Sequence, residues 1–191
     1  MKIVEKFKRK LAVAFALHEK PVSSFLKRMK GRIFVDVGAN YGYYSMILHR
    51  NFAKIYAFEH IPSIYEELKN NLRRYNNVKC IMKTVSDIDG ESVEVAYHGA
   101  HGFAKAVTLA SIFPTAKIDL VKVDAEGGEW AVLEGAEPIL SRIKSWTVEL
   151  HDPLRKEELE SWFISRGYSI RWLDFAYRGS KTANHIYAWR S

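Results

Sequence analysis

Residues 33–42 read Ile-Phe-Val-Asp-Val-Gly-Ala-Asn-Tyr-Gly. The mostly apolar first half, rich in β-branched side chains, predicts a short buried strand that ends at Gly38. Small residues follow, so the backbone can approach a ligand closely, and a helix expected over residues 41–50 would present free backbone N–H groups. The stretch therefore predicts a strand, a ligand-binding turn and a helix in succession.

The same alternation of apolar strands and amphipathic helices continues along the chain. Further strands are expected over residues 54–58, 78–82, 91–97, 118–123, 145–150, 168–173 and 185–189, and further helices over residues 62–75, 129–139 and 153–166. This order predicts an α/β fold with a doubly wound parallel sheet, helices on both faces and a closing antiparallel pair. Pro138 should end or kink its helix. Ligands of such sheets bind beyond the carboxyl ends of the strands.

The composition is that of a folded protein with one main domain. The chain has 191 residues, of which 48% are hydrophobic and 27% charged, which suffices for one core but not for two full domains. No apolar run reaches the roughly 18 residues of a membrane-spanning helix. The single cysteine, Cys80, is expected to be buried and inert, and it excludes an intramolecular disulfide and a cysteine-based zinc cluster. The cysteine count fits a reducing compartment, and no leader-cleavage site is evident. We therefore expect a cytoplasmic location.

Positive charge is concentrated at the N-terminus. The formal net charge is +7, yet residues 1–32 alone hold ten Lys or Arg against two Glu, so the remainder is nearly neutral. Apolar residues recur at helical spacing over residues 4–18, with lysines between them. We predict a basic amphipathic helical extension over residues 1–30 and a domain over residues 31–191. The extension either caps the domain or, through residues 1–20, docks onto RNA, an anionic membrane surface or a partner protein.

The turn after the first strand differs from a dinucleotide-binding fingerprint. Counted from Gly38, Asn40 and Tyr43 stand where the second and third glycines would be, which disfavours a pyrophosphate ligand and hence a dehydrogenase. Glu59 lies 21 residues after Gly38, where a carboxylate can accept both hydroxyls of a ribose. Ser86-Asp87 follows the third strand and can accept from the exocyclic amine of adenine, although this composition is also typical of a plain turn.

Three carboxylates follow the strand over residues 118–123. Asp124, Glu126 and Glu129 lie within six residues of one another. The negative charges of these carboxylates repel one another unless a cation, a proton or a cationic substrate is close. Glu129 also has a structural interpretation, because an acid in a first helical turn complements the helix dipole.

Histidines supply the remaining candidates. Glu149 and His151 should project to the same face at the end of a later strand, and His151 is either a general base or a surface-loop histidine. His98 and His101 fall in a glycine-containing loop predicted over residues 97–104, which is either a substrate-side loop or plain surface.

Taken together, the motifs resemble a known family, the FkbM-type S-adenosylmethionine-dependent methyltransferases. The resemblance covers about residues 31–151, and its most specific part is the pattern Lys-x-Asp-x-Glu-Gly-x-Glu. It is carried by Val35–Gly42, Phe58-Glu59, Ser86-Asp87, Leu120–Gly135 and Val148–His151. The resemblance implies a Rossmann-like seven-stranded sheet with an antiparallel last strand, and S-adenosylmethionine as the cofactor.

The resemblance also implies roles for individual residues. The cofactor-binding candidates are Asp36, Gly38, Ala39, Asn40 and Gly42 under the methionine part, Glu59 at the ribose, and Ser86 and Asp87 at the adenine. Asp124, Glu126 and Glu129 correspond to the family's acidic motif. From the residues themselves, the catalytic candidates are Asp124, Glu126 and His151, and the substrate-side candidates are Glu129, Glu149, His98 and His101.

The expected reaction is methyl transfer to a hydroxyl of a sugar, a glycan or a small molecule. The acidic group would take the proton, with His151 assisting. A divalent cation held by Asp124 and a neighbouring acid is an alternative to a purely side-chain mechanism. Two rival functions remain: an RNA methyltransferase that grips phosphates with its basic N-terminal helix, and a non-catalytic module that binds the cofactor or a partner.

Overall fold

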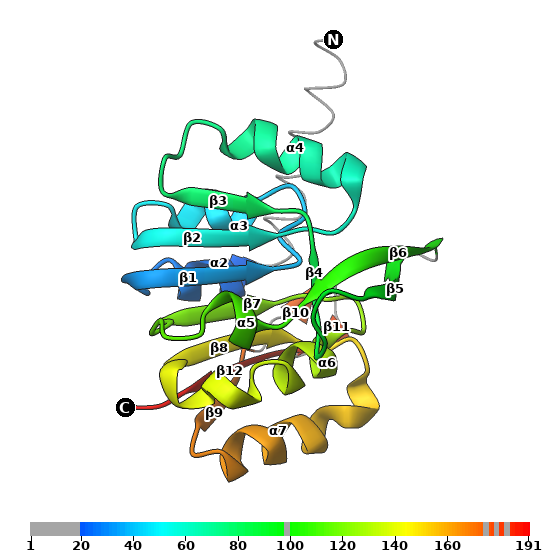
Figure 1. Ribbon diagram of the computed structural model, residues 1–191. Coiled ribbons are helices and arrows are strands. Elements are labelled where there is room, and N and C mark those ends of the chain that lie inside the picture. Colours follow the sequence, from blue (N-terminus) through cyan, green and yellow to red (C-terminus); the bar gives the residue numbers. More distant parts are fainter. Residues whose placement is uncertain (1–19, 98–99, 174–175, 178–179, 182–183) are drawn as a thin grey trace.

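The fold is a seven-stranded sheet with helices on both faces, and the computed structural model describes residues 20–97, 100–173, 176–177, 180–181 and 184–191 (Figure 1). The strand order is β3-β2-β1-β7-β8-β12-β9. These strands are β1 (Gly31–Val37), β2 (Phe52–Phe58), β3 (Val78–Ile81), β7 (Leu120–Val123), β8 (Ser145–Glu149), β9 (Ser169–Leu173) and β12 (His185–Trp189).

Strand directions confirm the predicted doubly wound arrangement. The pairs β1–β2, β2–β3, β1–β7 and β7–β8 are parallel, whereas β12 runs antiparallel to both of its neighbours, β8 and β9. From β1 the chain builds outward first through β2 and β3, and then in the other direction through β7 and β8. The reversal creates a crevice at the carboxyl ends of β1 and β7, where ligands of such sheets bind.

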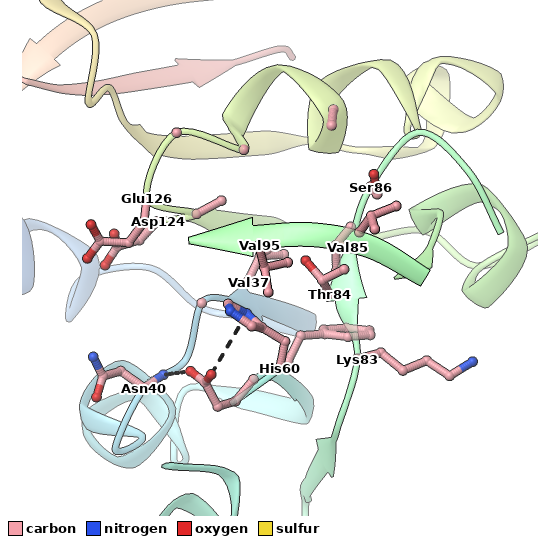
Figure 2. A pocket seen from close by; sticks show the side chains of 18 of the residues that line it. Val37, Asn40, His60, Lys83, Thr84, Val85, Ser86, Val95, Asp124 and Glu126 are labelled. Atoms are coloured by element: carbon pink, nitrogen blue, oxygen red, sulfur yellow. Dashed lines mark hydrogen bonds and ion pairs between the residues drawn. The ribbon is translucent and has the colours of Figure 1, made fainter. Parts of the chain in front are cut away.

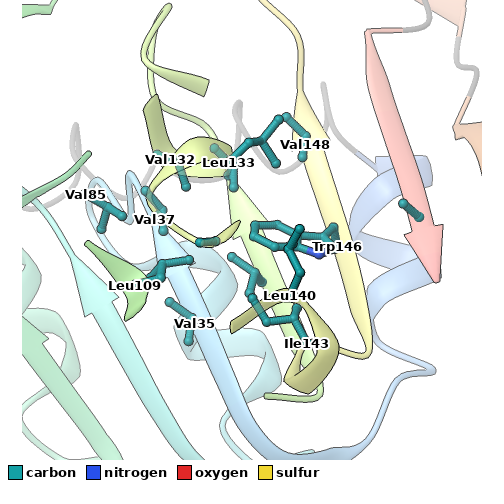
Figure 3. Packing of buried hydrophobic residues seen from close by; sticks show 14 of the residues in the cluster. Val35, Val37, Val85, Leu109, Val132, Leu133, Leu140, Ile143, Trp146 and Val148 are labelled. Atoms are coloured by element: carbon teal, nitrogen blue, oxygen red, sulfur yellow. The ribbon is translucent and has the colours of Figure 1, made fainter. Parts of the chain in front are cut away.

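Alternating side chains of the central strands face two different helical layers. Phe34 packs with α2 (Lys20–Leu26) and α3 (Tyr43–Leu48), and α4 (Pro62–Leu72) covers Ala57 on the same side. Val35 and Val37 belong to the larger core on the other face (Figure 3). That face is covered by α5 (Leu109–Ile112), α6 (Glu129–Glu134), the 3₁₀ helix η1 (Glu137–Arg142) and α7 (Lys156–Ser165), which follows the short 3₁₀ helix η2 (Pro153–Arg155).

The helix expected over residues 129–139 is divided in the structure. It ends with α6 at Glu134, and Pro138 stands in the first turn of η1, so the predicted break lies near the proline. Gly135 lies at the junction, and a Cβ there would approach the carbonyl oxygen of Ser86 to 2.0 Å. The close approach fixes the end of α6 against the segment that follows β3.

The predicted loop over residues 97–104 is wrong. Most of these residues belong to an antiparallel hairpin of β5 (Ser92–Tyr97) and β6 (Ala100–Val107), and β6 also pairs with β4 (Thr84–Val85). Glycine-rich composition indicated a loop, but cross-strand pairing such as Glu94 opposite Phe103 outweighs that local signal. A second small hairpin comprises β10 (Ala176–Tyr177) and β11 (Ser180–Lys181).

The described structure begins with α2, which is part of the core. Val22 and Leu26 are fully buried, and Phe25 packs edge-on against Tyr187 of β12 at 4.7 Å between ring centroids. The amphipathic helix predicted over residues 4–18 lies outside the described residues. Within the described ranges, none of the helices has both the length and the apolar character needed to cross a bilayer.

Candidate functional site

A cavity of about 400 Å³ opens at the carboxyl ends of β1, β2 and β7. Its floor and one wall come from the turns after these strands, and β4 and β5 form the opposite wall. Figure 2 shows Asp124 and Glu126 at one end of this space and Val85 and Ser86 across it. The cavity therefore lies at the crevice that the sheet topology predicts.

The turn after β1 needs glycine at Gly38. Its φ is +70°, and a Cβ there would lie 1.8 Å from the backbone oxygen of Asp124, so the turn presses directly against the end of β7. Gly42 has φ +85°, and its Cβ would meet Leu68 at 2.8 Å. Asn40 also has a positive φ, 50°. Gly38 and Asn40 line the cavity, whereas Ala39 is buried beside α4.

Asp36 lies in β1, just before this turn, and its side chain links the strand to α3. It is fully buried, and its Oδ2 accepts from both the backbone N–H (3.1 Å) and the hydroxyl (2.7 Å) of Ser45 in α3. Burial raises the pKa of Asp36, while Lys122 and the Ser45 bonds act in the opposite direction. Asp36 is not among the described residues that line the cavity. Its side chain therefore holds the first strand to the following helix.

Glu59 is the carboxylate at the centre of the cavity floor. Its Oε2 accepts from the backbone N–H of Asn40 at 3.0 Å, and its Oε1 accepts from that of Ile61 at 2.8 Å. The residue is 4% exposed, and burial raises its pKa against the lowering effect of these N–H donors. His60 lines the cavity beside it, and burial lowers the pKa of this imidazole. A carboxylate has about four lone-pair positions, so acceptor capacity remains for a ligand.

The far end of the cavity is mostly apolar. Phe58, Val85, Val95 and Ala131 line it. Ser86 lines the same end and donates its hydroxyl to Oδ1 of Asp87 at 2.9 Å. Asp87 itself is exposed and is not one of the described cavity-lining residues. This end of the cavity is an apolar slot with a hydroxyl at its edge, suited to a flat ring.

Asp124 and Glu126 stand at the opposite end, on the turn after β7. Both line the cavity, and Glu126 holds a strained positive φ of 50°. Oδ2 of Asp124 lies 3.1 Å from Nζ of Lys122, which is 3% exposed and also lies over the ring of Tyr44 at 4.9 Å. A buried ammonium therefore compensates the charge of Asp124.

His151 supplies the second cation of this cluster. Its Nε2 lies 3.8 Å from a carboxylate oxygen of Asp124 and 3.8 Å from one of Glu126. Its Nδ1 lies 2.7 Å from Oε1 of Glu129, a buried carboxylate that also accepts from the N–H of Gly127 at 2.9 Å. The Glu129 hydrogen bond raises the pKa of His151 to about 9. The imidazole is therefore protonated at neutral pH and neutralises the acids, as a cluster of this kind requires.

Glu149 lies apart from the described residues that line the cavity. Oε2 of Glu149 lies 3.3 Å from the buried His185 of β12, and its Oε1 accepts from the amide of Asn184 at 2.9 Å. Burial raises the pKa of Glu149, but the interaction with His185 and the charges of Lys122 and His151 outweigh it and lower the pKa to about 2. His101 is in β6, opposite Ala96. His98 lies outside the described residues.

Sequence reasoning gave no role to four residues that contribute to the site. Lys122 precedes Asp124 by two residues in a strand, so both project to one face, and this alternation could have identified it. His60 follows Glu59 directly but carried no motif. Val93 and Val95 reach the cavity only because the β5–β6 hairpin folds over it, which no local pattern indicates.

Solved methyltransferase structures share this fold. The chain is similar to magnesium protoporphyrin IX methyltransferase from Synechocystis PCC 6803, solved with bound S-adenosylmethionine, at 15% identity and a TM-score of 0.62 over 94% of this chain and 81% of that one. It is also similar to precorrin-6y C5,15-methyltransferase from Geobacter metallireducens GS-15, at 14% identity and a TM-score of 0.57 over 88% and 86% of the two chains. At these identities the likeness establishes the fold.

The sequence comparison identifies the family. No curated protein matches this chain by sequence. Residues 36–170, however, match the family described as the methyltransferase FkbM domain. The match begins at Asp36 under the first turn, includes Glu59 and the Asp124–Glu129 segment, and ends in β9. Because it spans well over half of the chain and coincides with the residues that build the cavity, this protein belongs to the FkbM methyltransferase family.

Proposed function

We propose that this enzyme transfers a methyl group from S-adenosylmethionine to a hydroxyl oxygen of a small molecule or glycan. The observation that carries the proposal is one cavity with a nucleoside-type floor at Glu59 and two carboxylates, Asp124 and Glu126, at its other end. The same space thus offers a place for the donor and proton acceptors for the substrate.

The residues present fit the cofactor. Glu59 retains acceptor capacity for the hydroxyls of a ribose, and the slot at Phe58, Val85 and Val95 matches a planar adenine. Nε2 of His60 is buried and has no hydrogen-bond partner within the described structure, which leaves a polar atom at the cavity for a ligand to satisfy. A cavity of about 400 Å³ is in the range that holds a ligand of this size.

When bound, S-adenosylmethionine supplies an electrophilic sulfonium methyl. The protein has to align the acceptor, exclude water and remove the hydroxyl proton. His151 is a poor acceptor because it already carries a proton at neutral pH. Asp124 or Glu126 therefore accepts the proton, while Lys122 and His151 hold the two carboxylates in place and offset their mutual repulsion.

The test is methyl transfer from labelled cofactor to panels of glycans, small phenols and total RNA. We expect label in a hydroxyl-bearing glycan or small molecule, lost at least about a hundredfold in Asp124→Asn or Glu126→Gln while cofactor affinity changes by less than about 1 kcal/mol. Label appearing in RNA alone would overturn the substrate class. If turnover survives both substitutions but stops when a chelator is added, proton removal depends on a metal ion and not on these side chains.

A further inference from the structure

The edge of the sheet opposite the cavity is basic. At this edge the parallel strands begin and β12 ends (Figure 1). In the sequence, a Lys or Arg stands close to the end of each of the seven strands at this edge. We call this set the basic edge: Lys27, Arg28 and Lys30 before β1, Arg50 before β2, Arg73 and Arg74 before β3, Lys117 before β7, Lys144 before β8, Arg166 before β9 and Arg190 after β12.

These charges have few acidic partners. Arg166 pairs with Glu137, and within the described part of the chain the other nine residues of the basic edge form no ion pair. Asp119, which lies on the same edge, is occupied by the backbone N–H groups of Arg32 and Ile33. The turns at the carboxyl ends hold the acids Glu59, Asp124 and Glu126, and Lys122 and His151 offset part of their charge. Positive charge on the basic edge thus has little acidic compensation among the described residues.

Local helix stabilisation explains only part of this row. Lys27, Arg50, Arg73 and Arg166 follow helix C-termini, where positive charge complements the helix dipole. Lys30 and Lys117 are exposed and lie a full turn or more beyond the preceding helices α2 and α5, so no dipole accounts for them. A row in which six of the seven strands contribute a charge without an ion-pair partner among the described residues indicates a surface adapted to a negatively charged partner.

The row extends across the whole width of the sheet. Six inter-strand spacings give a length of about 29 Å. Near one end of the row is a hollow of about 500 Å³ lined by His49, Arg50, Arg74 and Tyr75, which can take a phosphate group. The large apolar side chains most exposed in the described chain, Phe103 and Leu154, belong to β6 and η2 and not to this edge. Contact here would be electrostatic, without insertion.

We propose that the basic edge docks the enzyme onto an anionic lipid surface, with the cavity facing away from it. The position of the cavity favours lipid over RNA. A methylated RNA would have to present its acceptor at the carboxyl ends, about 20 Å from the basic edge along the seven residues of β1. A docked membrane leaves the cavity open to a substrate that arrives from the water phase.

The experiment is co-sedimentation of the full-length protein with vesicles of mixed phosphatidylserine and phosphatidylcholine, and with phosphatidylcholine alone. Each basic residue near an anionic surface contributes about fivefold to partitioning. The variant Lys30→Gln, Arg50→Gln, Lys117→Gln, Lys144→Gln should therefore bind the mixed vesicles at least about a hundredfold more weakly. Binding should also require phosphatidylserine and decline with salt.

The matched control removes the same charge elsewhere, with Lys69→Gln, Lys105→Gln, Lys156→Gln and Arg171→Gln, all outside the basic edge. A much smaller loss in the control supports the proposal. Equal losses of binding in both variants would show that only net charge matters and would overturn the proposal. Unchanged binding of the basic-edge variant would overturn it as well. An RNA oligonucleotide that binds through the basic edge more tightly than the vesicles would assign the surface to nucleic acid instead.

Discussion

Gly38 is the residue at which the turn after β1 has least freedom. A Cβ would require both a strained positive φ and the displacement of the Asp124 backbone. We expect Gly38→Ala to lower the free energy of unfolding by at least about 3 kcal/mol, a fall in melting temperature of roughly 6–12 °C. The control is Gly102→Ala, where a Cβ meets nothing within 4 Å. Similar melting temperatures for the two variants would refute the role given to Gly38.

Glu59 should control cofactor affinity more than stability. In Glu59→Gln an amide N–H₂ replaces one of the two acceptor oxygens now used by Asn40 and Ile61, and the charge that would bind a ribose is lost. We expect cofactor binding to weaken by about 2–3 kcal/mol, measured by calorimetry. Glu157→Gln, exposed on α7, serves as the control. Unaltered affinity in Glu59→Gln would place the ribose elsewhere.

His151 should titrate far from the ordinary range of histidine. Glu129 raises the pKa from 6.5 to about 9, so the folded state holds this proton more tightly than the unfolded state. The resulting stabilisation is complete below pH 6.5 and is lost as the pH rises towards 9. NMR of the imidazole should give a midpoint near 9, and Glu129→Gln should move it down. A wild-type midpoint near 6.5 would restore His151 as the proton acceptor.

The sequence predicts which residues come together at this site, but it does not predict their protonation states. Glu59 and Asp124 follow from their places after strands, because carboxyl ends of parallel strands converge. The state of His151 depends on Glu129, 22 residues away, and on the distance between their side chains. No periodicity encodes that distance, so the protonated imidazole was not predictable.

At the scale of elements, α2 is expected to contribute to folding like any core helix. Leu26 is fully buried beside Phe34. Leu26→Ala should therefore lower the free energy of unfolding by about 2–5 kcal/mol, measured in urea. Leu154→Ala, at a side chain that is 92% exposed, should change it by less than about 0.5 kcal/mol. Equal stability of both variants would show that α2 is dispensable for the core.

The helices and strands also differ in how well they can be predicted from the sequence. The strands of the main sheet are apolar runs, and their residue ranges were predicted to within a few positions. The β5–β6 hairpin was missed in part because its outer face is exposed, with Phe103 and Glu94 both facing solvent. Its strands are fixed by pairing rather than by burial, and pairing is not visible in a single segment.

At the scale of the whole molecule, the correct ligand should stabilise the entire cooperative unit. S-adenosylmethionine at about a hundred times its dissociation constant should add about 2.7 kcal/mol, which corresponds to roughly 5–11 °C in melting temperature. NADH at the same concentration should add little, because Asn40 and Tyr43 replace the glycines that a pyrophosphate requires. A larger shift with NADH than with S-adenosylmethionine would contradict the assigned cofactor site.

The position of β12 between β8 and β9 also constrains the order in which the protein can assemble. When residues up to Leu173 have left the ribosome, β9 has no strand beside it, and β8 keeps an open edge with unpaired N–H and C=O groups. Both strands gain their partner only when residues 185–189 are synthesised and slide between them. The nascent chain is therefore exposed to edge-to-edge association through β8 and β9 until β12 has emerged and paired with both.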